Sequence, residues 1–212
     1  MTRTYIRAVR LRKWFPPDDQ LAASIARLII LREDFMLELY GVHAESIESL
    51  DGHSAQWRRT YFFRNSVRTL WEIQGTLTTI RMNREFRHML QKRSHKVRAD
   101  LKQICAKLNA ASAVTRTIRN ALGGHILPQA VQTALNNIAY DRWGVLEVGR
   151  VSKDTHFKMA GDLVVEIFAD GVPESQKSSK IEGDIGTLAE LLPVVVQLEE
   201  VINIYLEERD LI

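Results

Sequence analysis

The feature that most constrains the fold is an unbroken helical stripe in the middle of the chain. Between residues 97 and 122, apolar or small side chains recur at alternating spacings of four and three residues, which places them on one face of an α-helix. A helix with such a stripe needs a facing helix to bury it. The stripe therefore predicts a helical bundle, and its members are Val97, Leu101, Ile104, Leu108, Ala111, Thr115, Ile118 and Leu122.

Other segments repeat apolar residues at helical spacing and carry helix signals at their ends. Asp18 and Asp19 supply capping oxygens for the first helix, and Pro128 suits the first turn of another. Thr187 and Glu190 have the spacing of a capping box, and Pro193 is expected to bend or start the last helix. The predicted helices cover residues 20–41, 57–89, 97–122, 128–140, 159–171 and 187–205.

These segments indicate an all-α protein. Among 212 residues, 11 glycines and 5 prolines are too few for a sandwich of many short strands. The prediction is a single domain, 1–212, built as an up-and-down bundle of about five helices. It has a basic N-terminal arm at 1–17, a small irregular or β-hairpin insert near 143–158 and a mobile loop at 171–186.

Compartment and cofactors follow from what the residues can support. The only cysteine, Cys105, cannot form an internal disulfide, and no cleavable signal precedes the first apolar segment, so we expect a cytoplasmic protein. The longest apolar stretches fall short of the ~20 residues of a membrane-spanning helix, so no membrane is expected. No histidines, cysteines and carboxylates have metal-ligand spacing, and no glycine-rich phosphate loop occurs, so neither a metal nor a cofactor is expected.

Charge is distributed unevenly along the chain. Residues 1–120 contain 22 lysines and arginines against 11 acidic residues, whereas residues 121–212 contain 7 against 15. Of the 29 basic residues 20 are arginines, whose planar guanidinium matches phosphate oxygens. The first half fits an anionic partner. The alternative is a solvated helix surface, or two charged halves that attract each other within the fold or between subunits.

One short segment combines side chains that could cleave a phosphodiester. Arg119 and Asn120 lie at the end of the striped helix, and His125 follows the Gly123-Gly124 break. An arginine can neutralise charge on a phosphorane, an imidazole can transfer a proton near neutral pH, and an amide can orient either group.

Arg119, Asn120 and His125 match in order and spacing the hallmark of the HEPN superfamily, and the chain resembles that superfamily over about residues 20–170. The resemblance implies a four- or five-helix bundle and a homodimer that brings two motifs together. It also implies metal-independent endoribonuclease activity in toxin–antitoxin, antiviral or RNA-processing settings, with RNA as substrate and a protein inhibitor or regulator as a further partner. These three residues would be catalytic.

A second function remains open. Many members of the superfamily cleave nothing, and a bundle of this kind can serve as a non-catalytic interaction or regulatory module. Arg119 would then pair with an acidic neighbour, Asn120 and Gly123 would end the helix, and His125 would pack in the turn.

Overall fold

A computed structural model describes residues 10–43, 55–112, 115–116, 128–138, 143 and 159–210. These residues are helical or lie in turns, with no strand among them, so the all-α prediction is confirmed for this part of the chain. The expected insert at 143–158 lies outside the described residues except for Trp143.

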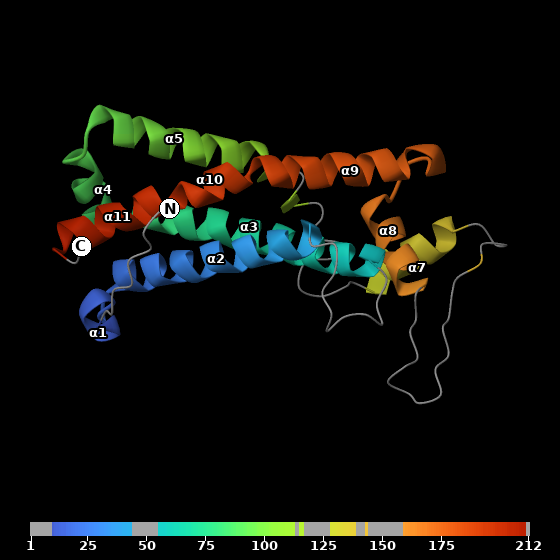
Figure 1. The fold of residues 1–212 in the computed structure, drawn as a ribbon, viewed down its shortest axis with the longest axis horizontal. Coiled ribbons are helices and arrows are strands. Elements are labelled where there is room, and N and C mark those ends of the chain that lie inside the picture. The colour runs from blue at the N-terminus through green and yellow to red at the C-terminus, as the bar shows by residue number, and fades with distance from the viewer. Residues whose placement is uncertain are drawn as a thin grey trace, which may run out of the picture.

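Four antiparallel columns form the body of the described structure. They are α2 (Gln20–His43), α3 (Ala55–Met82), α5 (His95–Ala110) and the succession α9 (Glu174–Glu190), α10 (Leu192–Val196) and α11 (Leu198–Glu208). Successive columns run in opposite directions (Figure 1). Contacts join α2 to α3, α3 to α5, α5 to α10 and α11, and these two helices back to α2, which closes a square bundle.

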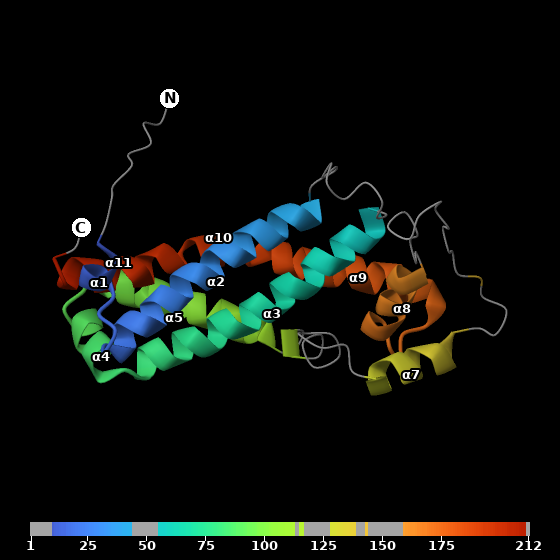
Figure 2. The ribbon, with the colours of Figure 1, turned by 90° about the horizontal axis from the view of Figure 1, so that it is seen from below.

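Shorter helices cover the two ends of this bundle. At one end, α1 (Leu11–Trp14) lies beside α2 and α11, and α4 (Arg84–Gln91) connects α3 to α5 (Figure 2). At the other end, α7 (Pro128–Asn137) packs on α8 (Met159–Phe168), which contacts α3 and α9. The described part of the basic arm is anchored at the α1 end of the bundle. There the hydroxyl of Tyr205, on α11, donates to the Trp14 carbonyl at 2.8 Å, and the Phe15 ring stacks on Tyr205.

The predicted stripe is confirmed where the structure describes it, but the helix expected over 97–122 ends at Ala110, with Ala111 as its C-cap. Leu101, Ile104 and Leu108 are buried against α3, α10 and α11, and Ala111 and Thr115 are buried as well. The stripe therefore belongs to the core of a single chain.

Two predicted helix starts are also confirmed. The Ala22 N–H donates to Asp19 Oδ1 at 2.9 Å, which caps α2. Pro128 is the first residue of α7. The last column bends near Pro193, which lies in the first turn of α10.

Two other boundaries were also predicted wrongly. A single helix was expected over 57–89, but α3 ends at Met82 because Asn83 leaves the helical conformation and caps α4. The Asn83 Oδ1 accepts the N–H groups of Glu85 and Phe86 at 2.9 and 3.1 Å. An asparagine side chain readily accepts such N–H groups, so Asn83 ends one helix and starts the next even though the apolar periodicity continues across it.

The loop expected at 171–186 is the second error, because α9 is helical from Glu174 onward. Ile181, Ile185 and Leu188 have helical spacing and pack on the core, a signal obscured by the polar residues around them. Thr187 is consequently not a cap: its hydroxyl donates to the Gly183 carbonyl one turn earlier, at 3.0 Å.

Candidate nucleic-acid interface

The three predicted catalytic residues, Arg119, Asn120 and His125, lie outside the described residues. The structure describes the chain as far as Arg116 and again from Pro128. The described surface that directly precedes the motif in the sequence is that of α5 and the residues just after it.

The apolar stripe of α5 faces the core, so the two flanks of the helix are exposed. Both flanks carry basic side chains. Ser94 caps the helix, with its Oγ accepting the Val97 N–H at 3.3 Å. Arg98 and Lys102 are exposed on one flank, one helical turn apart. Arg116, which follows the end of α5, is exposed as well. Other lysines lie on the opposite flank, so α5 has two basic edges.

The first flank meets α3 and forms a continuous polar surface with it. Gln74 Nε2 donates to Asn109 Oδ1 at 2.8 Å, and the Arg116 Cζ lies 5.8 Å from the centroid of the Trp71 ring. We call this surface the basic seam. It comprises Arg81, Arg98, Lys102 and Arg116 together with Trp71, Gln74, Thr78 and Asn109.

No described acidic residue neutralises the positive charges of the basic seam. Within the part of the chain that the structure describes, its four basic side chains form no ion pair. By contrast, Lys92 and Arg93 pair with Glu208 and Glu207 of α11, so the two charged halves do attract each other on that side. The seam thus keeps the charge that a row of phosphates would need.

The middle of the basic seam offers no reactive thiol and no deep pocket. Burial raises the pKa of the Cys105 thiol, and the nearby Arg81 guanidinium only partly opposes this effect. The thiol therefore stays protonated at neutral pH and is a poor nucleophile. The cavity beside it measures about 40 Å³, room for about one water. The seam suits an extended polyanion better than a compact ligand.

Glu38 is a titratable residue that the sequence analysis missed. It lies between α2 and α3, where burial raises its pKa from 4.5 to about 7. A hydrogen bond from the Thr69 hydroxyl lowers the value, the Asp34 carboxylate raises it and the Arg68 guanidinium lowers it. No sequence pattern marks Glu38, because its pKa depends on how closely α3 covers it.

Comparisons with models of protein families, with curated proteins and with solved structures find no match to this chain. Among the described residues, no three histidines, cysteines or carboxylates are grouped so that they could hold a metal. None of the described helices is both long and apolar enough to cross a bilayer.

Proposed function

We propose that the protein is a metal-independent endoribonuclease that holds RNA on the basic seam and cleaves it with Arg119, Asn120 and His125. The observation that carries the proposal is the row of basic side chains along α3 and α5 that pair with no described carboxylate. This row includes Arg116, three residues before Arg119 in the sequence. The resemblance to the HEPN superfamily supplies the chemistry.

The proposed reaction uses the ribose 2′-OH as nucleophile. Since the sequence has no set of residues at the spacing of a catalytic metal site, the substrate itself must supply the attacking oxygen. His125 takes or returns the proton, Arg119 stabilises the phosphorane charge, and Asn120 orients one of these groups or the phosphate. The 2′-oxygen forms a bond to phosphorus, the 5′-oxygen leaves with a proton, and a 2′,3′-cyclic phosphate results.

The activity is tested by incubating the purified protein with a mixed RNA pool in excess EDTA. We expect cleavage of RNA but not of DNA, 2′,3′-cyclic phosphate ends, and loss of cleavage in His125→Ala without a change in Tm. Loss of activity on chelation, equal cleavage of DNA, or full activity in His125→Ala would refute the mechanism.

The role of the basic seam is tested separately by RNA binding. Replacing Arg98 and Lys102 with glutamine removes two phosphate contacts, so the slope of log K against log salt should fall by about 1.4 for single-stranded RNA. The control replaces Lys96 and Lys107 with glutamine, which removes the same charge from the opposite flank of α5. Equal loss in both double variants would mean that net charge alone, and not the seam, attracts RNA.

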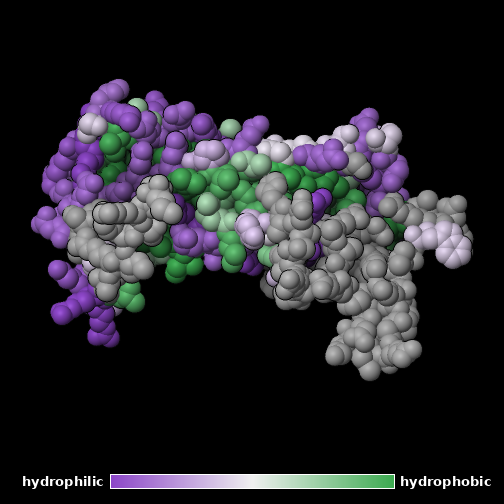
Figure 3. Space-filling view, in the orientation of Figure 1, coloured by the Kyte–Doolittle hydropathy of each residue, from purple (hydrophilic) through white to green (hydrophobic). Residues whose placement is uncertain are grey.

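We also propose a homodimer, formed through α2. The apolar stripe of α5 is used inside the chain, so it is not available to a partner. On α2, however, Ile30, Leu37 and Tyr40 are 61%, 68% and 70% exposed. Apolar side chains show in green along this helix in Figure 3. Ala23 and Ala26 lie on the same face of α2, and in an antiparallel pair these small residues would lie opposite Leu37 and Tyr40 of the second copy.

The same exposed residues favour the second candidate function, a non-catalytic interaction module. A partner protein would then cover α2, and Arg119 and His125 would be structural. In that case replacing either residue lowers Tm, whereas under the nuclease proposal it removes activity and leaves Tm in place.

A further inference from the structure

An open cavity lies apart from the basic seam, between α3, α8 and α9. Its volume is about 290 Å³, which corresponds to ~10 waters and lies close to the lower end of small-molecule sites, about 300 Å³. Its walls are mainly apolar. They include Phe63, Phe168, Ile181 and Ile185, and the two phenyl centroids are 5.1 Å apart with their planes tilted by 59°.

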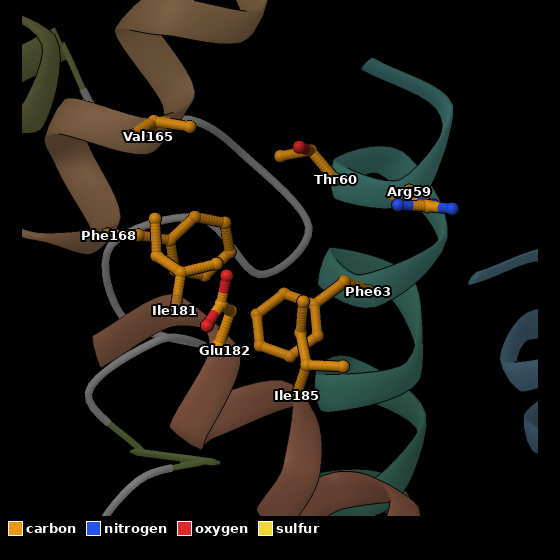
Figure 4. A pocket seen from close by; sticks show the side chains of 8 residues that line it. All are labelled: Arg59, Thr60, Phe63, Val165, Phe168, Ile181, Glu182 and Ile185. Carbon is orange, nitrogen blue, oxygen red and sulfur yellow. The ribbon is translucent and has the colours of Figure 1, made fainter. Parts of the chain in front are cut away.

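One carboxylate lies on this apolar lining. Figure 4 shows Glu182 extending from α9 between Phe168 and Ile185. Arg59 also borders the cavity, but its guanidinium is on the far side of α3 from Glu182 in this view. No residue in the described part of the chain forms an ion pair with Glu182, so the cavity presents a negative charge that nothing described neutralises.

The neighbouring lysines of α9 are engaged elsewhere. Lys177 is buried and pairs with Glu166 of α8 and with Glu174 at 2.6 Å, and both carboxylates raise the pKa of its ammonium. Lys180 pairs with Asp184 at 2.9 Å. The Lys177–Glu166 pair also joins α9 to α8, and Glu166 is only 2% exposed. This buried pair holds two walls of the cavity in place.

We propose that this cavity binds a small organic ammonium cation with an apolar body. The ammonium lies at the mouth beside Glu182, which is exposed to solvent, and the apolar body contacts Phe63, Phe168 and Ile181. A charged hydrogen bond to the carboxylate attracts the ammonium group, and the aromatic and aliphatic walls bury the apolar body. An anionic head group is repelled by the carboxylate, and a neutral one forms a weaker bond.

The test uses three probes with the same body and different heads: hexylammonium, hexanol and hexanoate. Each is titrated into the full-length protein, and binding is followed by calorimetry and by NMR shifts. Hexylammonium should bind at least ~10-fold more tightly than hexanol, the ratio expected for one charged hydrogen bond, and hexanoate should bind least.

The variant Glu182→Gln should abolish this preference and weaken hexylammonium at least ~10-fold. The control Glu190→Gln removes the same charge from α9 outside the cavity lining and should leave binding unchanged. Ile181→Trp fills the cavity and should block all three probes, with circular dichroism verifying the fold. Equal affinity for the three heads, no binding of hexylammonium at ~10 mM, or unchanged binding in Glu182→Gln would overturn the proposal. RNA binding and cleavage enter none of these readouts, so the result is independent of the proposed nuclease activity.

Discussion

Replacing Glu38 with glutamine should stabilise the protein above neutral pH and not below pH ~5. Glutamine keeps the size of the side chain and removes its charge. In the folded protein, burial between α2 and α3 disfavours the carboxylate and raises the pKa of Glu38 to about 7. One of its oxygens, Oε2, is buried and accepts no hydrogen bond from the described residues.

The sign of the effect follows from proton binding. Between the ordinary value of 4.5 and about 7 the folded state holds a proton at Glu38 that the unfolded chain has lost. The contribution of Glu38 to stability is therefore fully present below pH 4.5 and is lost as the pH rises through 7. Each pKa unit corresponds to about 1.4 kcal/mol, so the rise from 4.5 to about 7 sets an upper bound of ~3.5 kcal/mol. Glu38 is partly exposed, and solvent screening reduces the figure to about 1–2 kcal/mol.

The assay is urea unfolding of the wild type and of Glu38→Gln at about pH 4.5 and at about pH 8. The variant should be more stable by ~1–2 kcal/mol at the higher pH and close to the wild type at the lower pH. In a thermal melt at the higher pH, the same difference corresponds to a rise in Tm of about 2–8 °C for a chain of this size. Glu190→Gln, on the exposed surface of α9, should show no such pH dependence. The same stability change in Glu38→Gln at both pH values would show that burial does not raise the pKa of Glu38.

Two further predictions concern α2 and α3. Gly41→Ala should destabilise the protein by about 1–3 kcal/mol, because an added Cβ would lie 2.5 Å from the Phe62 ring. Gly75→Ala, where the added Cβ meets open space, should stabilise the protein by up to ~1 kcal/mol. Stability changes of the same sign for the two variants in urea unfolding would contradict this. Leu37→Glu should convert the proposed dimer to a monomer in sedimentation experiments, with Met82→Glu, equally exposed on α3, as the control, and an unchanged mass would rule out α2 as the interface.

Some of this architecture was predictable because it depends on neighbours in the sequence. The stripe of α5 follows from the spacing of Leu101, Ile104 and Leu108, and the start of α2 follows from Asp19, which caps an N–H three residues away. The break at Asn83 was missed because the apolar pattern continues on both sides of it. The start of α9 was missed because its apolar residues are few among polar ones.

The candidate sites themselves were decided by tertiary structure. Arg116 and Trp71 are 45 residues apart in the sequence, and they meet only because α5 packs beside α3. The raised pKa of Glu38 depends on which helix covers it. Glu182 pairs with no described residue because the neighbouring lysines of α9 are already engaged. Spacing along one helix determines which side chains share a face. Desolvation and Coulomb energy depend on distances between helices, and a one-dimensional pattern does not contain those distances.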